Sequence, residues 1–398
     1  MSRPDSMSAI KSSYVPAIDG LRALSILCVL AFHGVGCLKS LVGKSGWLGV
    51  DIFFVISGFL ITRLAIQELA GTGQVDFKRF YRHRILRIAP AFYFMLAIYA
   101  LFNPFNSDHN LAAVCLAAVH LSDYDVGLGW GNSIISGLAY CWSLSVEEKY
   151  YLLFPLLIWA YNKLRSPLLF VLLFVGCQFW KVFVIAGNPD WVRLTGPFDM
   201  RFDTILVGCI AACWFDHRNR QISALASRLG NFPGSRFMAP LLFLLGWYWL
   251  YHFISPVDPK GVAARSLFFI GFMPCFSALV AMFLVVITAN HERGVSDLVS
   301  RLLRIPPLVW LGRISYSLYL WHGVSFSLAE HWALKNQIVN GFTLDGVRLG
   351  LAIGLAAGSY YIIERPFLAM KSGPVPSRLP ATNDNTVVIR PVVASANR

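Results

Sequence analysis

Ten long apolar runs, separated by short polar segments, constrain the fold of this chain more than any other feature. Because a lipid bilayer offers no partners to backbone N–H and C=O groups, a chain crosses it only as helices or as a closed barrel. A run of about 20 apolar residues is long enough for one helical span. The runs lie at 21–40, 47–67, 88–106, 143–161, 167–187, 200–216, 237–254, 266–289, 308–329 and 345–367. We therefore predict an all-α, polytopic bundle of ten membrane helices.

The charged residues are few, and their positions predict an orientation. Charged residues make up 14% of the chain and hydrophobic residues 56%, whereas a soluble domain has roughly a quarter charged residues. The formal charge of +13 comes from short clusters between the apolar runs. This distribution matches the positive-inside rule and does not indicate a nucleic-acid-binding surface. With the N-terminus inside, most Lys and Arg lie in cytoplasmic segments, so both termini are predicted to be cytoplasmic.

The chain divides into three parts. Residues 1–15 form a polar segment that we predict to be cytoplasmic, and residues 16–367 form the membrane domain. Residues 368–398 are rich in Pro, Asn, Val and Ser, which predicts a disordered cytoplasmic tail. The first apolar run is longer than a signal-peptide core, so we expect it to be retained as a helix. The sequence has no cysteine pairing typical of a metal site, and we expect no metal.

The first apolar run carries an arginine and a histidine eleven positions apart, Arg22 and His33. At about 1.5 Å of rise per residue, the two lie roughly 16 Å apart along a helix. In a span at 21–40, the histidine falls near the membrane midplane. Ionisable groups there are costly, so His33 is a functional-site hypothesis. A structural hydrogen bond to a neighbouring helix is an equally good explanation of His33 alone.

Other polar side chains also interrupt the apolar runs. Buried charges in a membrane usually face the bundle interior and pair with one another. Each group could therefore belong to a structural ion pair, but together they predict a polar substrate cavity open toward the outer side. The residues assigned to the catalytic centre are Arg22, His33, Asp51 and Glu147. Those assigned to the substrate cavity are Trp142, Ser145, Arg201, Asp203, Tyr316 and His322.

A dense basic cluster precedes the third run and contains Arg84 and Arg87. Residues three apart share one face of a helix. Guanidinium groups bind phosphate oxygens in a bidentate fashion, so the pair is a candidate phosphate clamp. An anchor that contacts anionic lipid headgroups is the competing explanation, and the cluster alone favours it.

Six sequence blocks occur in an order that resembles the acyltransferase 3 family of integral-membrane O-acyltransferases. The resemblance covers about Pro16 to Phe367. Members acylate hydroxyl groups of cell-envelope glycans, lipopolysaccharide O-antigen, nodulation factors and some macrolides. The blocks are Ile18-Asp19-Gly20-Leu21-Arg22-Ala23 with His33, Gly49-Val50-Asp51 through Leu60, Arg84-Ile85-Leu86-Arg87-Ile88-Ala89-Pro90, Trp142-Ser143-Leu144-Ser145-Val146-Glu147, Gly312-Arg313 through His322, and Glu364-Arg365-Pro366.

The resemblance implies roles for particular residues. Arg22 and His33 match the arginine-to-histidine spacing of the family, in which the histidine is essential. Arg84 and Arg87 match a paired-arginine motif associated with the acyl donor, and Glu147 matches the acidic end of the serine–glutamate block. Many relatives carry a further C-terminal hydrolase-like domain. The chain looks like a stand-alone member, which leaves open a separate extracytoplasmic partner.

From these observations we predict a multi-pass enzyme of the bacterial cytoplasmic (inner) membrane. It would take an acyl group, most often acetyl, from cytoplasmic acyl-CoA, which is a co-substrate and not a permanently bound cofactor. The acceptor would be a hydroxyl group of a glycan, glycolipid or macrolide-like molecule. His33 would act as general base or as an acyl relay, with Asp51 or Glu147 orienting its ring. A proton-coupled transporter or flippase of a glycan or glycolipid is the alternative.

Overall fold

The computed structural model describes residues 14–102, 108–127, 138–164, 166–217, 261–292, 294–295, 297–337 and 341–371. All regular structure in these ranges is helical, which confirms the all-α part of the predicted fold class for these residues. Among these described residues, six segments are long and apolar enough to cross a membrane by length and composition. They are Pro16–His33, Ser45–Thr72, Phe77–Leu101, Leu168–Ala186, Val262–Glu292 and Gly341–Ala369.

The predicted span at 237–254 lies outside the described residues, and every other predicted span overlaps a described helix. The N-terminal half contains α1 (Pro16–His33), α2 (Gly36–Val42), η1 (Gly43–Trp47), α3 (Leu48–Thr72), α4 (Phe77–Phe102), α5 (Asp108–Ala118), α6 (Ser122–Gly127), η2 (Ala139–Cys141), α8 (Trp142–Leu164) and α9 (Leu168–Ala186). The remainder contains α10 (Trp191–Thr195), α11 (Phe198–His217), α14 (Val262–Ser266), η3 (Leu267–Phe272), α15 (Met273–Glu292), α16 (Leu298–Leu303), α17 (Pro306–Arg313), α18 (Ser315–Lys335), α19 (Gly341–Ser359), η4 (Tyr360–Glu364) and α20 (Arg365–Ala369).

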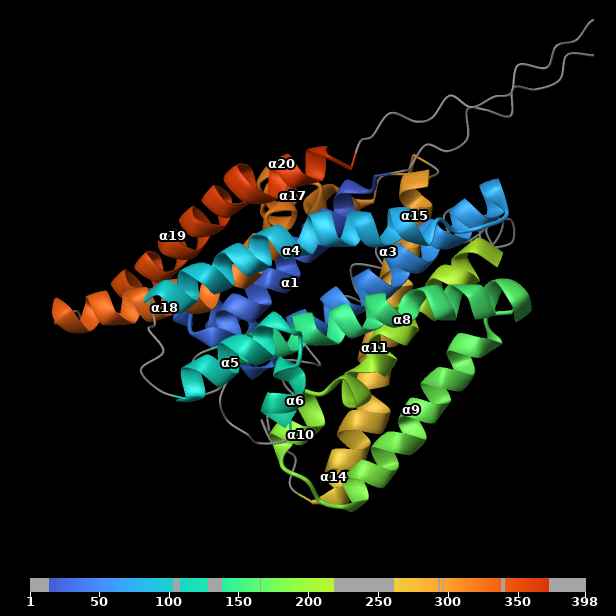
Figure 1. Cartoon of the computed structure of the whole chain (residues 1–398), viewed down its shortest axis with the longest axis horizontal. Coiled ribbons are helices and arrows are strands. Elements are labelled where there is room, and N and C mark those ends of the chain that lie inside the picture. The colour runs from blue at the N-terminus through green and yellow to red at the C-terminus, as the bar shows by residue number, and fades with distance from the viewer. Residues whose placement is uncertain are drawn as a thin grey trace, which may run out of the picture.

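Helix α3 is central to the bundle and packs along α1 and α11 (Figure 1). The backbones of α3 and α11 approach closely at two glycines. A Cβ atom at Gly58 would overlap the carbonyl group of Ile205, and one at Gly208 would overlap that of Val55. Small residues at such crossings let membrane helices pack backbone to backbone. In Figure 1, α18 and α19 form one flank of the bundle and α9 lies on the opposite flank.

The first helix ends earlier than the sequence predicts. Gly34 follows α1 with φ of +146°, a conformation that L side chains rarely adopt, and its N–H bonds back to Leu30. The Arg348 guanidinium of α19 donates to the Gly34 carbonyl oxygen at 2.6 Å. His33 is therefore the last residue of α1 and not a residue at its middle, which corrects the predicted span of 21–40.

Two later spans are also divided. The backbone at Ile314 departs from helical geometry (φ −87°, ψ 3°) and separates α17 from α18. A π-helical turn, η4, joins α19 to α20, and such turns often lie at functional sites. Helix α20 continues to Ala369, so residues 368 and 369 belong to the folded domain and not to the predicted tail. Residues 1–13 and 372–398 lie outside the described ranges.

Candidate active site

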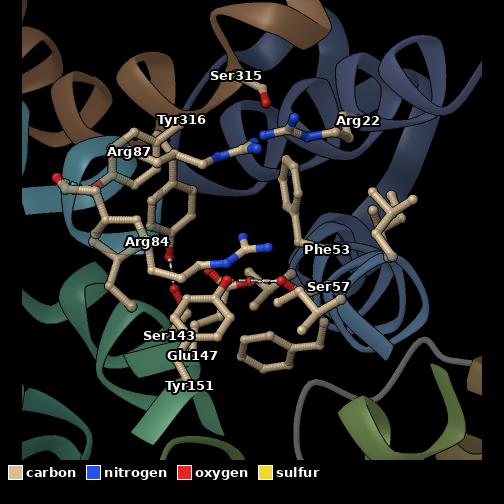
Figure 2. A pocket seen from close by; sticks show the side chains of 18 of the residues that line it. Arg22, Phe53, Ser57, Arg84, Arg87, Ser143, Glu147, Tyr151, Ser315 and Tyr316 are labelled. Atoms are coloured by element: carbon tan, nitrogen blue, oxygen red, sulfur yellow. Dashed lines mark hydrogen bonds between the residues drawn. The ribbon is translucent and has the colours of Figure 1, made fainter. Parts of the chain in front are cut away.

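A pocket lies inside the bundle between α1, α3, α4, α8 and α18 (Figure 2). It encloses about 890 Å³ of empty space, counted to its mouth. Apolar side chains of α3 form one wall, and polar groups from the other helices project into the space. Its polar lining residues are Arg22, Ser57, Arg84, Arg87, Ser143, Glu147, Tyr151, Ser315, Tyr316 and Tyr319.

Three arginines line this pocket, and among the described residues one of the three has a carboxylate within ion-pair distance. Arg22 and Arg87 point toward each other from α1 and α4, and Arg84 points into the space beside them (Figure 2). Arg22 lies 3.8 Å from the carboxylate of Asp19, whereas Arg84 and Arg87 form no ion pair with any described residue. The Arg84 guanidinium stacks 5.2 Å from the Tyr151 ring centroid, and its Nε atom is buried without a hydrogen bond. This excess of positive charge favours binding of an anion with several oxygens.

Glu147 faces the same pocket from α8. Its carboxylate accepts a hydrogen bond of 2.6 Å from the Ser57 hydroxyl group, which lies 2.9 Å from the Tyr151 hydroxyl group. The tyrosine ring in turn stacks under Arg84. Glu147 is thus held among pocket groups at the side of the arginines, as Figure 2 shows.

Lys371 extends the basic cluster beyond the end of α20. The Arg82 guanidinium of α4 donates to the Met370 carbonyl oxygen at 3.1 Å, which places Lys371 beside α4. Burial, together with the charges of Arg87 and Arg84, lowers the pKa of Lys371 to about 7, against the opposing effect of Glu364. A bound anion would reverse this repulsion.

Two hydroxyl groups that line the pocket contact each other. The Ser143 and Tyr319 hydroxyl oxygens lie 2.6 Å apart, and Tyr319 donates to the Tyr140 carbonyl oxygen at 2.8 Å. Behind this pair, the Tyr319 ring centroid lies 5.3 Å from that of His322. The His322 centroid in turn lies 5.0 Å from that of His33. A series of neighbouring rings therefore leads from the pocket to the C-terminal end of α1.

His33 is exposed and does not line the pocket. Asp51 and Glu147, which the sequence suggested as partners that orient its ring, both form hydrogen bonds elsewhere. Asp51 forms a buried ion pair with Arg201 of α11. The Arg201 guanidinium is enclosed by aromatic rings, with those of Trp47 and Trp142 centred 5.7 and 5.8 Å away. The Asp51 carboxylate thus neutralises Arg201, and its role in orienting His33 stays a prediction.

Of the six residues predicted to line a substrate cavity, Tyr316 lines this pocket. Asp203 is buried in an ion pair with Lys181 of α9 at 2.6 Å. The Ser145 hydroxyl group donates to a backbone carbonyl of its own helix at 3.2 Å. Arg201 and Asp203 thus form buried ion pairs between helices, which is the alternative that the sequence left open for such groups.

Four polar groups in the pocket, beside it or in the buried ion pairs were not predicted from the sequence. Tyr319 lies inside the same block as Tyr316 and His322, so its hydroxyl group could have been found by helical spacing. Lys181 is a lone cation within an apolar run, which by itself signals a buried partner. Ser57 lies within the block from Gly49 to Leu60, whereas Lys371 carries no comparable sequence signal.

Comparison with known proteins identifies the family. A family model described as an acyltransferase domain, that of the acyltransferase 3 family, matches residues 15–362. The chain belongs to the acyltransferase 3 family. It is therefore a multi-pass membrane protein of an acyltransferase family. No solved structure matches the chain significantly.

Several curated relatives of this acyltransferase 3 chain are known. The peptidoglycan O-acetyltransferase OatA of Listeria monocytogenes is 29% identical over 78% of this chain and 49% of its own length. A putative O-acetyltransferase of Staphylococcus aureus strain COL is 28% identical over 90% of this chain and 58% of its own length. The O-acetyltransferase OatA of Staphylococcus aureus strain NCTC 8325 is 28% identical over 89% and 57%. The chain spans about half the length of the curated relatives it matches.

Proposed function

We propose that this protein is a membrane O-acetyltransferase that moves an acetyl group from cytoplasmic acetyl-CoA to a hydroxyl group of a cell-envelope polysaccharide. The observation that carries the proposal is the group of three arginines in one pocket, with a single carboxylate contact among them. Coenzyme A bears several phosphate groups, and guanidinium forks bind phosphate oxygens in pairs. The names of the relatives support acetyl as the acyl group.

The acyl arm of the donor would extend from the arginines toward Tyr319 and Ser143. Coenzyme A carries its thioester at the end of a long, thin pantetheine arm, so the phosphates can stay at Arg84 and Arg87 while the acyl group enters the bundle. Arg22 and His33 are eleven residues apart on α1, which is roughly 16 Å. The chemistry would therefore take place at the end of the bundle opposite to the phosphates.

His33 would act as general base there, because a neutral imidazole accepts a proton at physiological pH. The acceptor oxygen attacks the thioester carbonyl carbon while its proton passes to the His33 ring. The carbon–sulfur bond then breaks, and the thiolate sulfur takes that proton. Transfer through an acyl-histidine is the other route, and an acetylated histidine trapped in the absence of acceptor would reveal it.

The acceptor class follows from the relatives by analogy, since one of them is named for peptidoglycan. In the bacterial cytoplasmic membrane with both termini inside, the exposed His33 would face the envelope. A separate extracytoplasmic protein would complete delivery to the polymer if the acceptor lies far from the membrane.

The test compares ester-linked acetyl groups on purified envelope polysaccharides from four strains. These are a deletion strain and strains complemented with the native chain, His33→Ala or His331→Asn, all at equal expression. His331 is an exposed residue of α18 and serves as the control. Loss of one ester in the deletion and His33→Ala strains, with restoration by the other two, would support the proposal. Equal ester content in all four strains, with a polysaccharide precursor retained inside cells of the deletion strain, would instead support the transporter alternative.

A further inference from the structure

His322 is a buried histidine whose ring is fixed in one orientation beside His33. The side chain is 1% exposed. Its ring packs among aromatic rings, with Tyr140 centred 4.7 Å away and Phe326 5.9 Å away. The Nδ1 atom lies 2.5 Å from the backbone carbonyl oxygen of Tyr319. Because a carbonyl oxygen only accepts hydrogen bonds, this contact assigns the proton to Nδ1.

The second nitrogen of this ring is left without a partner. In the neutral ring, a proton on Nδ1 leaves a lone pair on Nε2. Nε2 is buried and has no hydrogen bond to any described residue. Buried polar atoms are usually paired, and an exception calls for an explanation. The ring of His33 is centred 5.0 Å from the His322 ring, at an interplanar angle of 52°.

We propose that His322 is the positioning residue for His33, in the role that the sequence assigned to a carboxylate. The Nε2 lone pair accepts a hydrogen bond from one ring N–H of His33 when the acceptor substrate is bound. The other nitrogen of His33 then carries the lone pair that takes the proton of the hydroxyl group. This inference rests on the proposed function, because it gives His33 the role of base.

The carboxylates predicted to orient the His33 ring are bonded to other residues, whereas the His322 ring lies next to it. Asp51 is held by Arg201 and Glu147 by Ser57, so both carboxylates that the sequence suggested as partners of His33 have other partners. Orientation by a hydrogen-bonded partner is a large part of the efficiency of a histidine base, as triads show. The proton also stays in balance: it moves from the hydroxyl group to His33 and then to the thiolate of the donor, and His322 keeps its own proton on Nδ1 throughout.

Two substitutions distinguish the hydrogen bond at Nδ1 of His322 from the one at Nε2. In His322→Asn, the side-chain amide can still donate to the Tyr319 carbonyl oxygen, but the acceptor at Nε2 is lost. In His322→Gln, the side-chain oxygen reaches the former position of Nε2 and can accept from His33. The matched control is His331→Asn, which makes the same change at an exposed position on the same helix.

The assay measures transfer of radiolabelled acetyl groups from acetyl-CoA to isolated envelope polysaccharide by the full chain in lipid nanodiscs. For His322→Asn we expect kcat to fall by about 10- to 100-fold, with the KM for acetyl-CoA within about twofold of native and an unchanged thermal midpoint. His322→Gln should recover a large part of kcat. Added to His33→Ala, the His322→Asn change should cause no further loss, because the two residues act together.

Equal losses of kcat in the Asn and Gln variants, or a kcat of His322→Asn equal to native, would overturn this inference. If His33→Ala is inactive while His322→Asn is fully active, this inference alone fails. Full activity of His33→Ala would overturn the proposed role of His33 itself.

Discussion

Replacing Arg84 by alanine should weaken the binding of acetyl-CoA and leave the chemical step nearly unchanged. The Arg84 guanidinium points into the pocket, forms no ion pair with a described residue and has a buried Nε atom without a hydrogen bond (Figure 2). A hydrogen bond to a charged group contributes about 1.5–3 kcal/mol. Since about 1.4 kcal/mol corresponds to a factor of ten, the KM for acetyl-CoA should rise by about 10- to 150-fold. In Arg84→Lys, which keeps the charge and loses the planar fork, the rise should be smaller.

The assay is initial-rate acetyl transfer in nanodiscs, with the acetyl-CoA concentration varied. Lys78→Gln is the matched control, because it removes one positive charge from an exposed position on the same helix. A second donor, S-acetylpantetheine, carries the thioester but no phosphate. Its KM should be the same for native protein and Arg84→Ala. A rise of less than threefold in the KM for acetyl-CoA, or an equal rise for both donors, would refute the assignment of Arg84 to the phosphates.

Three further predictions concern stability and pH. Asp51→Ala should destabilise the fold by about 3–5 kcal/mol, because it leaves the buried Arg201 charge uncompensated. The double variant Asp51→Leu with Arg201→Met should recover most of the native thermal midpoint. A double variant as unstable as Asp51→Ala would contradict a purely structural role of the ion pair. With a pKa of about 7, Lys371 loses its charge as the pH rises through 7. The KM for acetyl-CoA should therefore rise about two- to fivefold between pH 6 and 8, relative to the Lys371→Arg variant, which keeps its charge. Parallel pH profiles of the native protein and this variant would argue against contact between Lys371 and the donor. Gly34→Ala should lower the free energy of unfolding by about 1–3 kcal/mol, because alanine is strained at a φ of +146°. The kcat should also fall, because His33 adjoins Gly34. An unchanged thermal midpoint would show that the turn relaxes and would contradict the prediction.

The fold class was predictable because apolar runs of spanning length leave a chain few alternatives in a membrane. The positions of Arg84 and Arg87 on one helical face also follow from their spacing, and the structure places both in the pocket. The end of α1 was not predictable to within a turn from hydrophobicity, because the apolar run continues past His33. The conformation of Gly34, fixed by a contact with Arg348 of a distant helix, decides where α1 stops.

The sequence by itself determined that the chain forms membrane helices, which polar residues interrupt them, and to which family the order of its motifs points. Only the tertiary structure decided how those polar residues are paired. Asp51 and Arg201 are 150 positions apart and meet because α3 and α11 cross at glycines. His33 meets His322 and not a carboxylate because α1 ends beside α18. Spacing along one helix fixes which residues share a face, whereas the partner across the interface depends on how the helices pack.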